Sequence, residues 1–524
     1  MQVFSPISYA LMLAFTLSAC SAEEPQPYSI VEKSVAEISA DIAGGRTTSE
    51  AVTAAYIERI EAVNPRIQAV ISVNPNAMLA ARASDARRTQ DQSLGPLDGI
   101  PILIKDNIDV AGIATTAGSL ALADNIPLND SPMVAYLRKA GVIVLGKANL
   151  SEWANFRSFG SSSGWSAVGG LVRNPYDLAR TTCGSSSGSG AAAAASLAAA
   201  TIGTETDGSV VCPSSINGVV GLKPTIGLVS RTGIVPISAS QDTAGPMART
   251  VTGAAALLTV MAGNDPEDPT TGEADAHKTD YASGLDATSL KGTRLGVLRD
   301  LDDFPPATLA VFEAALETLR AQGAELIDIA PDVSEAIGDA EFAVLLTEFK
   351  AGLNVYLAGT PEAVTTRTLA DVIAFNAAEP RELAEFDQSI FEAAEATAGL
   401  DDPTYITARD MAKHEAGPNG LSRMMDENNV IALLAPTYEA AWLINLENGD
   451  PSIASSSQLP AVSGYPHLTV PMGLADGLPV GLSFMGLPWS EQTLLSLGYA
   501  YEQAAGARVP PPELSTANTS NAAD

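Results

Sequence analysis

Residues 182–225 read TCGSSSGSGAAAAASLAAATIGTETDGSVVCPSSINGVVGLKPT, and the rest of the chain is organised around this stretch. It holds two loops rich in small residues, 184–188 and 203–209, on either side of an alanine-rich run. Glycine and other small residues let a backbone approach a substrate closely. The run from Ser189 to Thr201 has no helix breaker after Gly190, so it predicts a buried helix that leads into a short strand. The two loops can then meet in space and bring together serines from both.

Composition and charge restrict the class of protein. The chain has 524 residues, of which 46% are hydrophobic and 17% charged, as in a globular protein with a large core. Its formal net charge is −32, and no cluster of Lys and Arg offers a surface for phosphates, so nucleic acid is not an expected partner. We find no internal repeat and expect one domain over residues 30–506.

Alternating strand and helix patterns predict an α/β fold. Residues 100–104 are continuously apolar and end at Lys105, which is typical of a strand buried on both faces. Residues 132–140 and 142–145 then indicate a helix and a strand. We expect a central mixed, mostly parallel β-sheet with helices on both sides. Residues 335–425 have mostly helical patterns and are expected to form a cap or insertion.

The N-terminal segment is typical of an exported protein. Residues 1–19 contain the short apolar run of a signal peptide, too short to span a membrane. The run ends in Leu-Ser-Ala-Cys, which resembles a bacterial lipobox with Cys20 as the lipidated residue. We expect a lipoprotein of the bacterial cell envelope, on the periplasmic or outer surface, that contacts the membrane only through this lipid. A soluble secreted or periplasmic protein is the alternative. Residues 20–29 would form a tether and residues 507–524 a disordered tail.

The two other cysteines, Cys183 and Cys212, flank the central stretch. An oxidising envelope would allow them to pair, but spacing alone does not bring their backbones within bridging distance. We therefore favour the interpretation that both are buried free thiols. The chain has three histidines and no Cys/His cluster, so neither a metal site nor a cofactor is expected.

Two familiar serine motifs fit the chain poorly. Residues 184–188 match the G-x-S-x-G elbow of esterases, with His414 or His467 downstream as a base. That elbow must follow a strand, whereas residues 177–182 are polar. No serine has a Lys three residues later, which removes the Ser-x-x-Lys mechanism.

A third serine mechanism needs no histidine. Lys105 ends a buried strand, where α/β sheets place ligands. Burial disfavours the ammonium form, so the amine of Lys105 can stay neutral and act as a base. Lys105 would deprotonate Ser185, which in turn would activate Ser209.

Several motifs in fixed order resemble the amidase signature family. The matching segments are 104–107 (IKDN), 116–119 (TAGS), the Ser-rich loop, 203–209 (GTETDGS), 221–225 (GLKPT), 240–249 (SQDTAGPMAR), 464–466 (GYP) and 478–482 (LPVGL). The resemblance covers most of residues 30–505, and an ordered set is far more specific than one motif. The Thr-Glu-Thr-Asp-Gly-Ser version and the segment 180–184 (RTTCG) look most similar to bacterial peptide amidases.

This resemblance implies the amidase signature fold and a Ser-cisSer-Lys triad. Ser209 would be the nucleophile, Ser185 the bridging serine after a cis bond from Gly184, and Lys105 the base. The oxyanion hole would consist of the backbone N–H groups of four consecutive residues, Thr206, Asp207, Gly208 and Ser209.

Some positions depart from the usual family pattern or support the triad. Cys183 and Asp207 stand where Gly is usual, and Val211 stands where Arg is usual. Asp207 and Asp242 are candidates to orient the bridging serine or line the pocket, and Ser186 and Asp242 are candidate supporting residues around the triad. For the carboxylates, a structural role in a turn is an equal alternative.

The predicted function is hydrolysis of a carboxamide through an acyl-enzyme, with release of ammonia and without metal or cofactor. The expected substrate is a C-terminal peptide amide or a small-molecule amide, and no obligate protein partner is expected. The alternatives are a general aliphatic or aryl amidase or esterase, and a catalytically silent binding lipoprotein. The amidotransferase subunit that completes glutaminyl-tRNA also resembles this family, but an exported, acidic chain disfavours that role. We expect residues 335–445 to form the pocket walls.

Overall fold

The computed structural model describes residues 1–3, 28–299 and 301–512. Cys20, the signal peptide beyond residue 3 and most of the proposed tether and tail lie outside the described residues. Among the described residues, no helix combines the length and the apolar composition that a membrane crossing needs.

An eleven-stranded sheet forms the centre of the described chain, in the order β1-β3-β2-β6-β8-β7-β12-β13-β11-β9-β10. Its strands are β1 Val70–Val73, β2 Pro101–Lys105, β3 Ile143–Ala148, β6 Ala200–Glu205, β7 Val220–Lys223, β8 Thr243–Ala248, β9 Arg294–Leu298, β10 Glu325–Ile329, β11 Leu433–Pro436, β12 His467–Ala475 and β13 Leu478–Met485. A separate two-stranded sheet pairs β4 Trp165–Ser166 with β5 Gly170–Leu171.

The sheet is mixed and flanked by helices, as predicted. Its parallel pairings form two groups, β3-β2-β6 and β11-β9-β10. Of the ten pairings within this eleven-stranded sheet of the described chain, the other six are antiparallel. The predicted parallel strand pairings are therefore found within these two groups of strands. One antiparallel strand, β8, has no strand-like pattern, because Gly245 and Pro246 lower its β-propensity.

Helices cover both faces of this sheet. On one face of β12, Leu468 and Val470 lie against Gly498 of α17. On the other face, Thr469 lies near Gly481 of β13 and Ser215 of α7. Since alternate residues of a strand point to opposite faces, α17 and α7 lie on opposite sides. The helices outside the cap are α1 Val35–Ala43, α2 Ser49–Ile67, α3 Ala77–Arg88, α4 Pro132–Lys139, α5 Glu152–Asn155, α6 Ser187–Ala194, α7 Val211–Ile216, α8 Val251–Met261, α9 Ala274–His277, α10 Pro306–Ala321, α16 Gln458–Ser463 and α17 Glu491–Ala505, with the 3₁₀ turns η1 Leu120–Leu122 and η2 Pro269–Glu273.

The alanine-rich run does not form the single helix predicted over 189–201. Helix α6 ends at Ala194, Ser196 has a φ of +55°, and β6 begins at Ala200. Ala200 pairs with Ile102 of β2 and with Ala248 of β8. Alanine favours helix locally, but these two ladders recruit the end of the run into the sheet, so tertiary pairing overrides propensity.

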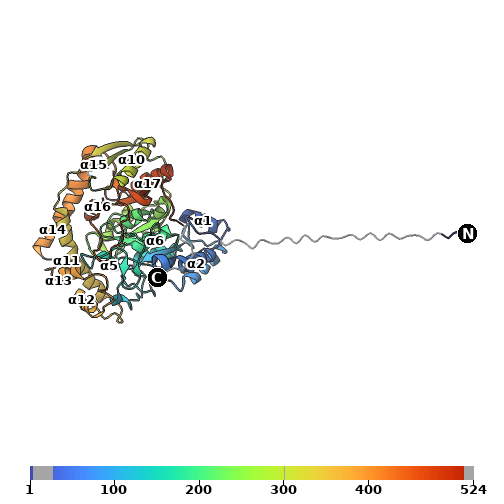
Figure 1. Cartoon of the computed structure of the whole chain (residues 1–524), viewed down its shortest axis with the longest axis horizontal. Helices are drawn as coiled ribbons and strands as arrows, with labels where there is room; N and C mark the ends of the chain where they lie inside the picture. Colours follow the sequence, from blue (N-terminus) through green and yellow to red (C-terminus); the bar gives the residue numbers. More distant parts are fainter. Residues whose placement is uncertain (4–27, 300, 513–524) are drawn as a thin grey trace, which may run out of the picture.

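The region 335–425 is helical, as expected, and forms one side of the molecule (Figure 1). It contains α11 Ile337–Ala358, α12 Leu369–Ala378, α13 Ser389–Glu395, α14 Pro403–Ala416, the short π-helix η3 Gly417–Ser422 and α15 Arg423–Asn428. We call this region the cap. It has its own apolar cluster, in which Phe349, Leu353 and Phe391 pack with Trp153 from the body of the protein.

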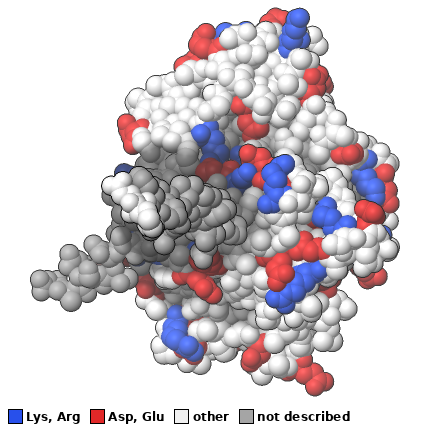
Figure 2. Space-filling model, turned by 90° about the vertical axis from the view of Figure 1, so that its right-hand side faces the viewer, with Lys and Arg blue, Asp and Glu red and all other residues white. Residues whose placement is uncertain are grey.

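Charged side chains are distributed over the surface with both signs mixed. Figure 2 shows acidic and basic groups interspersed on one face, without a basic patch.

Candidate active site

Lys105 lies at the carboxyl end of β2, as predicted, and is fully buried. Its Nζ donates to Ser185 Oγ at 2.7 Å and to the Oγ1 and carbonyl oxygen of Thr204 at 2.8 and 3.2 Å. Burial lowers the pKa of Lys105 to about 7, although the negative charges of Asp242 and Glu205 act to raise it. Lys105 therefore exchanges a proton near neutral pH.

The Ser-rich loop places two consecutive serines, Ser185 and Ser186, in one buried network with Lys105 and Thr204. The peptide bond between Gly184 and Ser185 is cis. Ser186 connects this loop to the second one: its Oγ donates to the carbonyl of Thr204 at 3.0 Å, and its backbone N–H donates to the carbonyl of Ser209 at 3.2 Å. The two predicted loops therefore meet, and Ser186 joins them.

A disulfide between Cys183 and Cys212 forms a second link between the loops. The prediction of two buried free thiols is wrong. The two Cα atoms are 6.0 Å apart, within the range that a disulfide bridges. The sequence could not show this distance, because it arises when the loop before α6 packs against α7.

The second loop carries Ser209, which is 8% exposed. The backbone N–H groups of residues 206–209 donate to no acceptor within the described chain. The next two N–H groups, of Val210 and Val211, donate to Glu205 Oε2 at 2.7 and 2.9 Å. Glu205 thus anchors the start of α7 and leaves the preceding N–H groups free to bind an oxygen.

Asp242 supports the second loop through its side chain. Its Oδ1 accepts from Thr206 Oγ1 at 2.6 Å, and its Oδ2 accepts from the backbone N–H groups of Ile237 and Ser238 at 2.8 and 2.9 Å. Burial raises the pKa of Asp242 to about 6. Asp242 has no direct contact with Ser185 among the described hydrogen bonds, so it positions Thr206 and not the bridging serine.

A cavity of about 280 Å³ opens onto Ser209. Its lining includes Asn155, Phe156, Cys183, Gly184, Thr206, Asp207, Leu345, Tyr438, Trp442 and Asp450. The sequence predicted walls from residues 335–445, and Leu345, Tyr438 and Trp442 come from that region. Asp450, whose carboxylate accepts from Trp442 Nε1 at 3.0 Å, carries no motif and was missed.

The histidines of the alternative esterase mechanism lie elsewhere. His467 is buried on β12 and hydrogen-bonds Ser483 at 2.6 Å. Burial lowers the pKa of His467 to about 3, so it stays neutral. His414 lies on α14 in the cap. Within the described chain neither histidine hydrogen-bonds a serine of the two loops, so the esterase elbow has no base.

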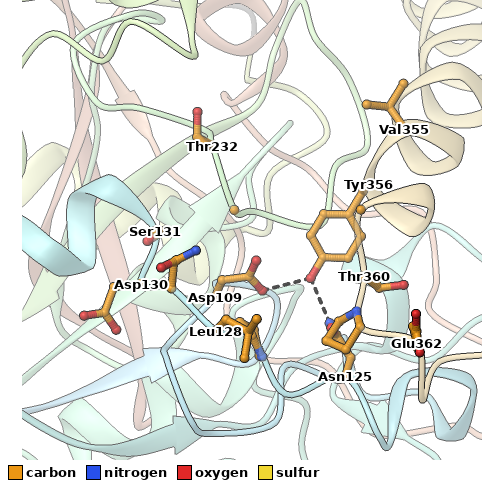
Figure 3. Close-up of a pocket in the computed structure, with 15 residues that line it drawn as sticks. Asp109, Asn125, Leu128, Asp130, Ser131, Thr232, Val355, Tyr356, Thr360 and Glu362 are labelled. Atoms are coloured by element: carbon orange, nitrogen blue, oxygen red, sulfur yellow. Dashed lines mark hydrogen bonds between the residues drawn. The ribbon is translucent and has the colours of Figure 1, made fainter.

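A larger cavity, of about 750 Å³, lies outside this site. Figure 3 shows its centre, where Tyr356 Oη donates to Asp109 Oδ1 at 2.8 Å and accepts from Asn125 Nδ2 at 2.9 Å. None of the residues proposed for catalysis lines it. Its central polar groups already bind one another, so its size alone does not indicate chemistry.

A mixed sheet flanked by helices, with a buried lysine bonded to a serine beside a cavity, defines a hydrolase of the amidase class. The chain belongs to the amidase family, whose model matches residues 51–495. The peptide amidase of Stenotrophomonas maltophilia is 49% identical, with a TM-score of 0.89 over 92% of this chain and 99% of that one. A probable amidase of Arabidopsis thaliana is 37% identical over 96% of both chains. A glutamyl-tRNA(Gln) amidotransferase subunit of Salinispora arenicola is 36% identical over 91% of this chain and 98% of its own.

Proposed function

We propose that the protein hydrolyses carboxamides with Ser209, Ser185 and Lys105 as a relay. Ser209 Oγ attacks the amide carbonyl, its proton passes to Ser185, and the proton of Ser185 passes to Lys105 Nζ. The free N–H groups of residues 206–209 receive the developing oxyanion. The single observation that carries the proposal is the bond between the buried Lys105 amine and Ser185.

The relay then runs in reverse to complete the reaction. Lys105 returns the proton through Ser185 to the leaving nitrogen, the C–N bond breaks, and ammonia departs from an acyl-Ser209. A water molecule gives its proton to the same relay and attacks the acyl carbonyl. The carboxylic acid leaves, and Ser209 regains its hydroxyl proton.

The proposed substrate is a peptide or small molecule that ends in a neutral carboxamide. The likeness to a solved peptide amidase supports this class. The cavity supports it too, because Phe156, Leu345 and Trp442 offer apolar surface, and Asp207 and Asp450 repel free carboxylates. No Lys or Arg lines the cavity in the described structure. An acid product would therefore be expelled.

We also propose that the protein is exported and anchored in the cell envelope through a lipid on Cys20. The disulfide between Cys183 and Cys212 supports an oxidising compartment, because disulfides are rare in reducing cytosol. The test is mass spectrometry of the mature N-terminus from a bacterial membrane fraction. A diacylated Cys20 is expected; an unmodified N-terminus at another residue would refute the anchor.

Ammonia release by the purified protein tests the reaction. The panel contains peptide amides, free Asn and Gln, aryl amides and an activated ester, with Ser209→Ala and Lys105→Ala as controls. We expect ammonia from peptide amides, lost in both controls. Turnover of aryl amides or esters alone would favour the general hydrolase, and no turnover by folded protein would favour a binding protein.

A further inference from the structure

Glu341 connects the cap to the catalytic region from outside any sequence motif. It lies in the second turn of α11 and is only 5% exposed. Gln241 Nε2 donates to its Oε1 at 2.8 Å, and Gln458 Nε2 donates to its Oε2 at 3.1 Å. These two amides hold the carboxyl group of Glu341 in one orientation.

Gln241 Nε2 also donates to the carbonyl oxygen of Thr206 at 3.4 Å, so Glu341 lies beside the loop that carries Asp207. The carboxyl groups of Asp207 and Glu341 interact with each other, and each affects the pKa of the other. Two carboxyl groups can hydrogen-bond only when one of them carries a proton. Asp207 Oδ1 is buried and has no hydrogen-bond partner among the described residues. A proton on the Glu341 carboxyl group would give the Asp207 carboxylate a donor.

The surroundings favour one retained proton. Burial and the charge of Asp207 raise the pKa of Glu341 to about 8, and burial raises the pKa of Asp207 as well. Two charged groups of the described chain face the pair. Lys223 of β7 attracts Asp207 and lowers its pKa, whereas Glu205 of β6 and Asp207 repel each other. The other groups packed against the pair are uncharged at neutral pH: Gln241, Gln458, Ser457 and Tyr438.

We propose that Glu341 is a positioning residue, which shares one proton with Asp207 and so holds the loop of residues 206–209 against α11. This inference rests on the proposed function, in which that loop supplies the nucleophile and the oxyanion donors. When the proton is lost, two buried carboxylates face each other and repel. The loop then loses its fixed position, and turnover falls at alkaline pH.

Ammonia release between pH 6 and 10 tests the role in catalysis. Above pH ~8, kcat of the parent protein is expected to fall about tenfold per pH unit. Glu341→Gln donates to Asp207 at every pH, so it should keep its activity at pH 9 to 10. Glu341→Leu, which can neither donate nor accept, should lose kcat by about tenfold at every pH with little change in KM. The same alkaline fall in Glu341→Gln as in the parent would overturn the proposal.

Asp339→Asn is the matched control. It removes one carboxylate from the exposed face of the same helix. A general effect of charge would change the alkaline fall in this variant too. We expect the pH profile of Asp339→Asn to follow that of the parent. If kcat of Asp339→Asn did not decrease at alkaline pH, the effect would not be specific to Glu341.

Thermal unfolding gives a readout that does not depend on turnover. The pKa of Glu341 is raised on folding from an ordinary value of 4.5, so its stabilising contribution is complete below that value and is lost as pH rises through about 8. The Tm of the parent minus that of Glu341→Gln should therefore decrease between pH 5 and 9. A constant difference would refute the shared proton. A decreasing difference in a protein that releases no ammonia would support the shared proton and refute the proposed function.

Discussion

At the scale of single residues, burial decides which groups can do chemistry. Lysine is usually solvated and protonated, but Lys105 has no exposed surface and donates only to neutral oxygens of Ser185 and Thr204. No carboxylate hydrogen-bonds its amine in the described chain, so desolvation dominates and lowers its pKa to about 7. A second buried lysine, Lys147, differs in this respect because Asp106 lies 3.1 Å from its Nζ.

Removing this base should abolish most of the turnover. We expect Lys105→Ala to lower kcat by about 10²- to 10⁴-fold, the usual contribution of a positioned base. The measurement is steady-state ammonia release at pH 8. Lys139→Ala, which changes an exposed lysine on α4, is the control and should retain parent activity. A decrease of less than tenfold in Lys105→Ala would contradict its role as base.

The acid side of the pH profile should report Lys105. Its amine must be neutral to accept a proton, and its pKa of about 7 means that protonation increases as pH falls. We therefore expect kcat/KM to fall about tenfold per pH unit below pH ~7. The profile of kcat/KM from pH 5 to 8 checks this. A profile that is flat down to pH 5.5 would show that a group with a lower pKa is the base.

The sequence could propose catalytic residues only where a motif contains them. Lys105, Ser185 and Ser209 stand in short segments whose order along the chain marks the family. Glu341 stands in a segment without a motif, and its partners Gln241 and Gln458 are 100 and 117 residues away in sequence. Asp450 also has no motif, and besides Trp442 its carboxylate accepts from the backbone N–H of Ser163, 287 residues away.

At the scale of elements, α6 shows why the central stretch is built from small residues. The helix is buried along its whole length. A Cβ at Gly188 would lie 2.3 Å from the carbonyl oxygen of Ala69 and 2.6 Å from the backbone nitrogen of Asn149. Glycine is therefore required there by close backbone packing and not by its conformational freedom.

Adding one methyl group to this helix should destabilise the protein. We expect Gly188→Ala to lower the free energy of unfolding by about 1–3 kcal/mol, the usual effect of overpacking a core. Gly272→Ala is the control, because a Cβ there meets no atom within 4 Å. Urea unfolding of both variants provides the test, and equal midpoints would show that α6 has room to move.

The disulfide joins the loop before α6, which contains Ser185, to α7, which begins just after Ser209. It closes a loop with a sequence separation of 29 residues. Loop-closure entropy for that length predicts that the Cys183→Ser/Cys212→Ser double variant loses about 3–4 kcal/mol of unfolding free energy. Denaturant unfolding under non-reducing conditions measures this loss. If the double variant matches the parent, the crosslink does not constrain the unfolded chain.

At the scale of the whole molecule, a buried ionic cluster holds the cap on the body. Arg157 pairs with Glu152 and with Glu382, which lies between α12 and α13, and all three side chains are fully buried. The guanidinium also lies over the ring of Phe386, 4.3 Å from its centroid. The cluster thus joins residues that are more than 200 positions apart in sequence.

Breaking this cluster should loosen the cap. We expect Arg157→Ala to lower the free energy of unfolding by about 3–5 kcal/mol, because it leaves buried carboxylates without a partner. Arg381→Ala removes an exposed arginine next to the cluster and should leave Tm nearly unchanged. Calorimetry of both variants checks the prediction. A similar small effect from Arg157→Ala would show that the cap is held by its apolar contacts.

The amino-acid sequence was enough to predict the family, the mixed α/β class and a buried Lys105 at the end of a strand, because these depend on short motifs and on local periodicity. Tertiary packing decided the split of the alanine run, the antiparallel β8, the disulfide and the contact between Asp207 and Glu341. The physical reason is sequence separation. Each of these features depends on contacts between segments far apart in the chain, and neither propensity nor spacing reports which distant segments pack together.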